Sequence, residues 1–355
     1  MMSVSRDAAG PCLAPGGSVL AVGAFDGLHR GHAALLAHVR ERAAARGLLP
    51  IAISFEPLPR AFFAREPLPR LGSVRDKLEG MEAAGIARLL LLRFNAALAA
   101  MSAEDFVHDV LVRRAGAREI WVGEDFRFGH ARRGNVALLE RLGGELGFAT
   151  QMFDTQHDAG ERVSSSAIRA ALAAGAFADA ARLLGRPFAI GGRVVRGQQL
   201  GRTLGYPTAN IRLGRRVSPV QGIFAVRVHG ATAGSLPGGR SGASCDRREC
   251  RAARDTGASL PGGRSSASFA RDTGASLPGV ASLGLRPTVG GREPLLEAHL
   301  FDFDGDLYGR RLAVEFVAKL RDEEKFASLD ALTAQMHRDA AAARAILGVP
   351  LSVSA

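Results

Sequence analysis

The pattern of apolar residues changes character close to residue 187, and this change limits the folds open to the chain. In the first half, short apolar runs alternate with amphipathic stretches such as 32–46, where Leu35, Leu36 and Val39 share one helical face. The apolar runs cover residues 18–24, 51–55, 86–94, 119–122 and 147–153. Nearly continuous apolar strands that alternate with helices are typical of a parallel sheet covered on both faces. The first half therefore predicts a doubly wound parallel sheet of the α/β class.

The second half contains strand patterns with few helices between them. Strands are predicted at 188–195, 222–229, 295–303 and 311–320, with turns rich in Gly, Pro and Asp between them. A helix is predicted over 328–347, with Ser328 as its N-cap. This half therefore predicts an antiparallel β-barrel or sandwich.

The chain length allows two domains, because 355 residues can form two separate cores. We expect the α/β domain at 18–185 and the antiparallel domain at 186–347. Residues 1–17 carry Gly, Pro and Ala without periodicity and are expected to form a flexible tail.

One segment, residues 231–279, fits neither pattern because it repeats itself. DTGASLPG occurs at 255–262 and again at 272–279, and the segment has few large apolar residues. Such a composition buries too little surface to offset the entropy lost on ordering. We expect a disordered insertion between two barrel strands, at a hairpin tip. The alternative is a basic interaction tail.

Composition narrows the classes of partner. The net charge of +11 favours anionic ligands, but only 6% of residues are aromatic and no basic stripe carries interleaved aromatics, so specific nucleic-acid binding is not expected. No apolar run is long enough for a bilayer, and the N-terminus lacks a secretory pattern. We expect a cytoplasmic protein without membrane association, and an oligomer remains possible.

A glycine-rich turn with two histidines follows the first apolar run. The segment GAFDGLHRGHAALL occupies 23–36, and a helix is predicted to begin near Gly31, with His29 and His32 at its start. Glycines allow close approach of a ligand, and free N–H groups at a helix start favour phosphate. Histidine rings can donate further hydrogen bonds to phosphate oxygens. The segment therefore predicts a phosphate-binding site.

These residues resemble the HxGH nucleotidyltransferases, and more narrowly the bacterial bifunctional riboflavin kinase/FAD synthetases. FEPLPR at 55–60 resembles a family motif, with Leu58 where His is usual. VGEDFRFGHARRGN at 122–135 resembles the flavin-side segment. VSSSAIR at 163–169 resembles a third motif, with Ser166 where Thr is usual.

The resemblance implies adenylyl transfer from ATP to FMN in the first half. His29 and His32 are then expected to contact the ATP phosphates as catalytic groups, and Asp125 and Phe126 to lie on the flavin side. Asp125 could instead cap a loop, and Asp26 could be a turn residue. The implied ATP site comprises Gly23, Phe25, Asp26, Gly27, His29, His32, Ser165, Ser166 and Arg169.

The second half contains the segment Gly205-Tyr206-Pro207-Thr208-Ala209-Asn210, which resembles the flavokinase signature. Gly205, Thr208 and Asn210 are expected to bind ATP and metal, because Thr208 and Asn210 offer oxygen donors suited to Mg²⁺. The segments 280–291 and 295–309 also resemble the family.

Two further residues receive roles from the same resemblance. Glu297 aligns with the carboxylate that serves as catalytic base in flavokinases, and Arg321, in LRDEEKF at 320–326, with a flavin-covering loop. Glu297 could instead be a solvated strand residue, and Arg321 could form a surface salt bridge.

The resemblance as a whole implies a doubly wound nucleotidyltransferase domain followed by an antiparallel β-barrel kinase domain. It implies an enzyme that phosphorylates riboflavin to FMN and adenylylates FMN to FAD, with ATP as co-substrate and Mg²⁺ as metal. Two alternatives stay open. The insertion could impair the kinase and leave only the adenylyltransferase step. The chain could also be a non-catalytic flavin- or nucleotide-binding regulator.

Overall fold

The first half of the chain forms a parallel sheet, as the sequence predicted. The computed structural model describes residues 1–197, 205–214, 216–231, 276–288 and 291–350. Six parallel strands lie in the order β1-β4-β3-β2-β5-β6. Their bounds are β1 Ser3–Ser5, β2 Ser18–Val22, β3 Leu49–Glu56, β4 Arg88–Arg93, β5 Ala117–Gly123 and β6 Ala149–Phe153. A short antiparallel pair, β7 (His157–Asp158) and β8 (Glu161–Arg162), follows.

Helices cover both faces of this sheet, and alternate strand residues point into two cores. Val19 and Ala21 of β2 pack with helices α1 and α3, whereas Leu20 and Val22 pack with the π-helical segment η1 and with α6. This alternation confirms the doubly wound arrangement. The helices are α1 Arg30–Ala45, α2 Pro59–Phe63, α3 Val74–Ala83, α4 Ala96–Ala100, α5 Ala103–Asp105, η1 Phe106–Arg114, the 3₁₀ turn η2 His130–Arg132 and α6 Val136–Leu146.

The N-terminal residues are not the flexible tail that the sequence suggested. β1 pairs in parallel with β4 at the edge of the sheet, with Val4 opposite Leu89. Leu13 is buried in the sheet core, and the Arg114 guanidinium donates to the carbonyl oxygens of Asp7 and Pro11. These contacts depend on residues about 100 positions away, so local composition gave no sign of them.

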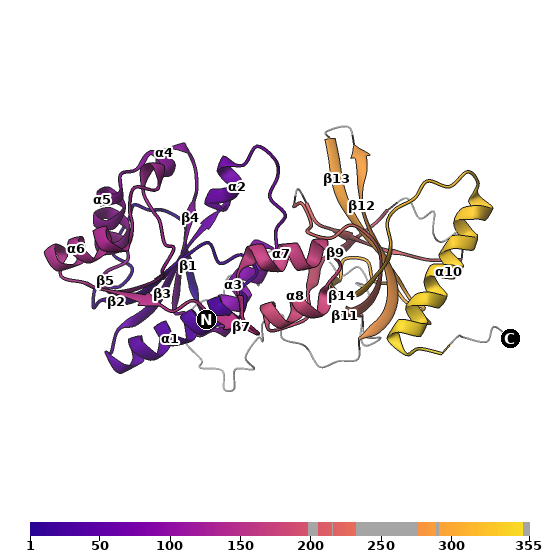
Figure 1. Cartoon of the computed structure of the whole chain (residues 1–355), viewed down its shortest axis with the longest axis horizontal. Helices are drawn as coiled ribbons and strands as arrows, with labels where there is room; N and C mark the ends of the chain where they lie inside the picture. Colours follow the sequence, from indigo (N-terminus) through magenta and orange to yellow (C-terminus); the bar gives the residue numbers. More distant parts are fainter. Residues whose placement is uncertain (198–204, 215, 232–275, 289–290, 351–355) are drawn as a thin grey trace, which may run out of the picture.

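The second half closes into an antiparallel barrel, which confirms the expected barrel and excludes the sandwich. The strand order around the barrel is β10-β13-β12-β11-β14-β9. Their bounds are β9 Ala189–Val195, β10 Ala209–Arg212, β11 Gly222–His229, β12 Leu277–Thr288, β13 Gly291–Leu300 and β14 Arg311–Arg321. Helix α10 (Leu329–Leu347), with Ser328 as its N-cap, lies on the side of the barrel that faces away from the sheet (Figure 1). No helix among the described residues is long and apolar enough to cross a membrane.

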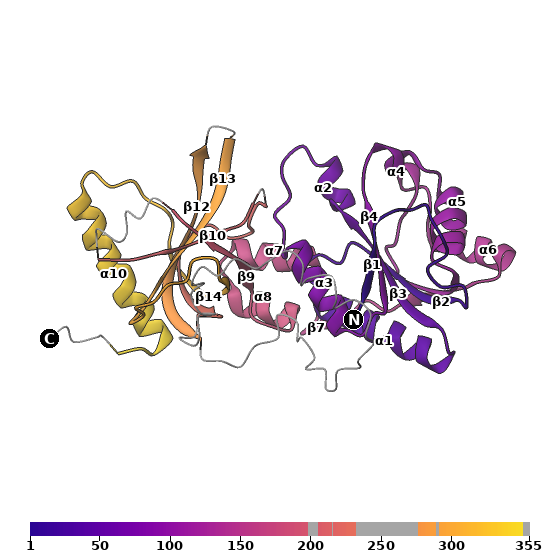
Figure 2. The ribbon, with the colours of Figure 1, turned by 180° about the vertical axis from the view of Figure 1, so that it is seen from behind.

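Helices α7 (Ser165–Ala173) and α8 (Phe177–Leu184) lie between the sheet and the barrel in both views (Figures 1 and 2). Their apolar residues belong to the barrel core: the ring of Phe177 packs edge-on against Phe224 of β11, with centroids 5.9 Å apart. The boundary expected at residue 185 therefore falls inside a continuous core, and the two halves share these helices.

The expected insertion at 231–279 overlaps the barrel at both of its ends. Ala231 is fully buried, and β12 begins at Leu277, so both ends of the expected 231–279 insertion belong to the barrel. Residues 232–275, on which the expectation of disorder falls, lie outside the described residues. The strands that flank them are antiparallel neighbours, with Val228 opposite Leu277. The segment thus leaves and re-enters the barrel at one hairpin end, as predicted.

Candidate functional site

The two motif histidines lie together where β2 leads into α1. His29 is the N-cap of α1, and its Nδ1 accepts a hydrogen bond from the His32 backbone N–H at 3.3 Å. The two rings stack with their centroids 3.6 Å apart, and the Phe25 ring meets His32 edge-on. The carboxyl end of a parallel strand and the start of a helix thus meet here, which is the position that binds phosphate in many α/β proteins.

Both imidazoles are held in the neutral form. Burial, aided by the positive charge of Arg186, lowers the pKa of His29 to about 4. Burial also lowers the pKa of His32 well below its ordinary value, and repulsion from the Lys77 ammonium and from a protonated His29 would act in the same direction. Because Nδ1 of His29 accepts a hydrogen bond, its proton lies on Nε2, which is then a donor. This arrangement offers N–H donors to an anion without a protonation step.

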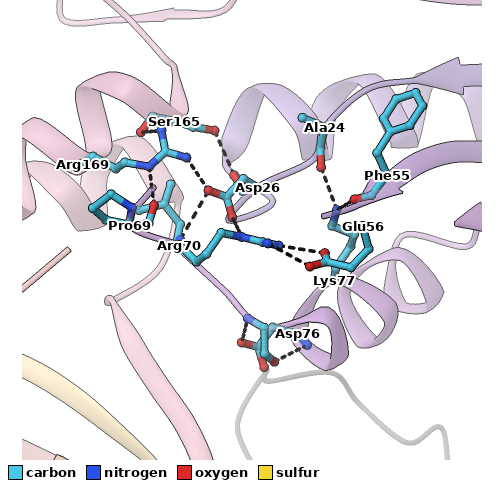
Figure 3. Close-up of polar contacts among 12 residues, drawn as sticks. Ala24, Asp26, Phe55, Glu56, Pro69, Arg70, Asp76, Lys77, Ser165 and Arg169 are labelled. Carbon is cyan, nitrogen blue, oxygen red and sulfur yellow. Dashed lines mark hydrogen bonds and ion pairs between the residues drawn. The ribbon is translucent and has the colours of Figure 1, made fainter. Parts of the chain in front are cut away.

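Asp26 anchors the glycine-rich turn to α7 (Figure 3). Its carboxylate is 3% exposed and forms ion pairs with Arg169 and Arg70. The Ser165 hydroxyl donates to the Asp26 carbonyl at 3.0 Å, and Arg169 also donates to the carbonyls of Pro69 and Ser165. The structure thus brings Asp26, Ser165 and Arg169 together, with Arg169 bound to protein groups. Its contact with phosphate stays a prediction.

The remaining predicted residues of the ATP site also lie around this turn. Phe25 and Gly27 both adopt positive φ, and a Cβ on Gly27 would lie 2.8 Å from the Leu71 Cβ, so this position requires glycine. Gly23 follows β2 directly, and the Ser166 hydroxyl accepts a hydrogen bond from Arg60 at 3.3 Å. Leu58, which stands where the resemblance led us to expect His, is buried as the N-cap residue of α2.

A buried lysine, which the sequence analysis did not identify, lies beneath the same turn. Lys77 of α3 is 4% exposed, and its ammonium donates to the Ala24 carbonyl at 2.8 Å, the Ser54 hydroxyl at 2.9 Å and the Phe55 carbonyl at 3.3 Å. Burial is the main cause that lowers its pKa to about 8. Lys77 ties the carboxyl ends of β2 and β3 together.

The predicted flavin-side residues lie near the β5 end, on the loop that follows it. Asp125 forms an ion pair with Arg162 at 2.5 Å, and the Phe126 ring stacks on Phe128 at 5.3 Å. The sequence analysis missed a second aromatic group around α2. Phe62 and Phe63 are exposed and pack edge-on against Phe94, and no spacing rule signals such a cluster.

In the barrel, strand pairing brings the predicted kinase residues together. Asn210 of β10 is directly opposite Glu297 of β13, and Ser282 of β12 is opposite Glu297 on the other side. Their strand neighbours Ile211 and Leu296 point into the barrel core, so Asn210 and Glu297 lie on the opposite face. The Asn210 Oδ1 atom is buried without a hydrogen-bond partner among the described residues.

The signature segment is anchored by residues that the sequence analysis did not single out. The His299 Nδ1 lies 3.0 Å from the Pro207 carbonyl, and burial lowers the pKa of His299. The Tyr206 hydroxyl lies 2.5 Å from Nδ1 of His337 on α10. Gly205 adopts a positive φ, and Thr208 is half-buried one residue before β10. These contacts hold the segment against β13 and α10.

Arg321, the predicted flavin residue, forms an ion pair with Asp339 of α10. Its Nη2 lies 2.8 Å from the Asp339 carboxylate, and the side chains are only 16% and 8% exposed. Its guanidinium also faces the Phe326 ring at 5.5 Å. The salt bridge that the sequence left open as an alternative is therefore present, though largely buried.

Comparison with known proteins gives both halves a family. The family described as FAD synthetase matches residues 13–167, and the family described as riboflavin kinase matches residues 184–347. A bifunctional riboflavin kinase/FMN adenylyltransferase of Escherichia coli K12 is 42% identical over 94% of both chains. Its counterparts in Pseudomonas fluorescens and Haemophilus influenzae are 41% and 36% identical, over 93% of this chain in each case.

A solved structure shares the arrangement of both halves. It is described as a macrolide-efflux protein from Streptococcus pneumoniae, has a TM-score of 0.68 and 25% identity, and the match covers 95% of this chain and 97% of that one. The efflux function named in that description applies to that protein and not to this chain. With both families matched in order, and relatives above 40% identity along nearly the whole length, the chain belongs to the bifunctional riboflavin kinase/FMN adenylyltransferase family.

Proposed function

We propose that this chain catalyses both family steps itself, phosphorylating riboflavin in the barrel and adenylylating the resulting FMN at the carboxyl edge of the parallel sheet. The observation that carries the proposal is the pairing of Asn210 with Glu297, which unites two distant motifs on one face of the barrel. A regulator that only binds flavin has no need of this pairing together with the histidine pair at the other site.

For adenylyl transfer, we assign His29 and His32 to the ATP phosphates. A phosphate oxygen of FMN attacks the α-phosphorus of ATP, and the bond from that phosphorus to the pyrophosphate oxygen breaks. Neutral N–H donors and the α1 N-terminus would stabilise charge on the transferring group. The hydroxyls of Ser165 and Ser166, at the start of α7, are assigned to the β/γ end of ATP.

We place the flavin ring of FMN between the loop after β5 and α2. Phe126 stacks on Phe128 in that loop, and Phe62 and Phe63 are exposed on α2. Exposed aromatic faces are suited to a planar ring. Arg60 of α2 donates to Ser166 at the start of α7, which connects this aromatic surface with the proposed triphosphate site.

For riboflavin phosphorylation, we assign Thr208 and Asn210 to Mg²⁺. The buried Oδ1 of Asn210 without a partner among the described residues fits a cation ligand, since Mg²⁺ prefers oxygen donors. When bound, the metal would neutralise charge on the ATP phosphates. Glu297 would accept the proton of the ribityl hydroxyl as its oxygen bonds to the γ-phosphorus and the bond to ADP breaks.

Replacing Glu297 by Gln tests this division of labour. The loss of a general base typically lowers turnover by about 10²- to 10⁴-fold, so we expect FMN formation to fall within that range while FAD formation from supplied FMN stays within about twofold. Glu315→Gln is the matched control, because Glu315 lies on β14, a barrel strand that does not adjoin β13, and its carboxylate is hydrogen-bonded to His229. Equal loss of both activities in Glu297→Gln would contradict the assignment.

A further inference from the structure

Arg186 reaches from the start of the riboflavin kinase half into the turn that carries the histidines. It lies directly after α8, within residues matched by the riboflavin kinase family. Its two terminal nitrogens donate to the Gly27 carbonyl at 2.6 Å and to the Leu28 carbonyl at 3.1 Å. The half described as a kinase thus contacts the backbone of the other half's glycine-rich turn.

These two bonds fix the direction of two successive peptide groups. In a trans peptide the C=O and N–H bonds point in opposite directions. Because the Gly27 and Leu28 carbonyls point at Arg186, the N–H groups of Leu28 and His29 point away from it. Gly27 and Leu28 both adopt positive φ, at 81° and 43°, and this costs energy for a residue such as leucine. The turn therefore needs outside contacts to hold it.

The guanidinium also acts on the turn through its charge. Carbonyl oxygens are neutral, so the two bonds leave a positive charge beside the loop. That charge contributes to the lowered pKa of His29, and burial lowers the pKa of Arg186 itself. Arg186 lines a cavity of about 750 Å³ between the two halves. The space beside its guanidinium is therefore not filled by packed side chains.

We propose that Arg186 is a positioning residue for adenylyl transfer, supplied by the kinase half of the chain, which aims the Leu28 and His29 N–H groups at the ATP phosphates. Successive N–H groups in a turn with positive φ form a concave anion site. The bonds from Arg186 hold that site in shape before ATP arrives. This inference rests on the proposed role of the turn in binding ATP.

The test is Arg186→Met in the full chain, with Arg186→Lys and Arg182→Met alongside. Misplaced phosphate donors cost catalysis on the order of 10- to 100-fold, so kcat/KM for ATP in FAD formation should fall by about that factor in Arg186→Met. FMN formation from riboflavin should stay within about twofold. Arg186→Lys should recover part of the loss, because an ammonium can bond to one of the two carbonyls.

Arg182→Met is the matched control. Arg182 lies on α8, four residues earlier, and also bonds across to the first half, with Nη1 2.7 Å from the Asp158 carboxylate, but it does not reach the turn. FAD formation should be preserved in this variant. Equal loss of FAD formation in both variants, or parallel loss of FMN formation in Arg186→Met, would overturn the proposal in favour of a general structural role.

A spectroscopic measurement separates positioning from loss of fold. In protein with ¹⁵N-labelled histidine, the pKa of His29 should rise above about 4 in Arg186→Met, because the nearby positive charge is gone while burial remains. An unchanged His29 pKa would contradict the inferred effect of the Arg186 charge on the turn. If the unaltered protein makes no FAD from FMN, the proposed function fails; if it does and Arg186→Met does so equally well, only this inference fails.

Discussion

At the scale of single residues, sequence spacing located the two histidines but did not indicate their protonation state. The pattern HxGH placed His29 and His32 at a helix start, and the structure has them there. Their neutrality arises from burial and from Arg186 and Lys77, which lie 157 and 45 positions beyond His29 and His32 respectively. No local pattern shows such a charge. The same holds for Asn210, whose buried oxygen is visible only once β10 pairs with its neighbours.

The neutral His29 leads to a prediction on pH. Its pKa is lower in the folded chain, about 4, than the ordinary value of 6.5, so between these values the unfolded chain binds more protons. This group's contribution to stability is therefore complete above about pH 6.5 and is lost as the pH falls towards 4. The urea midpoint should fall over that window, and by less in His29→Asn. FAD formation should show no step between pH 6 and 8 that depends on His29; such a step near 6.5 would contradict the neutral state.

At the scale of elements, the sequence predicted strands and helices but not all of their partners. The apolar run 222–229 became β11 with the same bounds. The sequence analysis missed β1 because a strand of three residues is too short to show an alternating pattern. It missed β12 because the start of this strand lies within the repeat DTGASLPG. The buried faces of α7 and α8 join the barrel core, and no sequence pattern could indicate this, because periodicity does not specify what an element packs against.

This packing predicts that a helix outside the barrel sequence supports the kinase. Phe177 of α8 contacts Phe224 and Phe316 in the barrel core. Phe177→Ala should lower stability by about 3–5 kcal/mol, since a large ring leaves a cavity. The temperature at which FMN formation is lost should fall markedly. Phe106→Ala, in the core of the sheet, is the control and should first affect FAD formation from FMN. Unchanged heat resistance of FMN formation in Phe177→Ala would contradict the shared core.

At the scale of the whole molecule, the chain consists of two sites linked by a shared layer. Helices α7 and α8 belong to the barrel core, while Arg169 of α7 and Arg186 after α8 bind the histidine-bearing turn. Length and pattern predicted two domains, and the order of motifs predicted two activities. The shared layer was not predictable, because the contacts that join it to the histidine-bearing turn and to the barrel link residues far apart in sequence.

The repeat segment bears on whether both steps run. Its flanking residues Val228 and Leu277 are paired, and the barrel is closed by all six strands. A long loop at a hairpin end costs little entropy to close, since the cost rises only slowly with length. A closed barrel with Asn210 and Glu297 paired favours an active kinase over an adenylyltransferase alone.

A time course tests this account most directly. The purified full chain is incubated with riboflavin, ATP and Mg²⁺, and flavins are separated at intervals. The account predicts that FMN appears first and then declines as FAD accumulates. FAD made only when FMN is supplied would contradict the active kinase, and no product from either flavin would contradict the two-step enzyme as a whole.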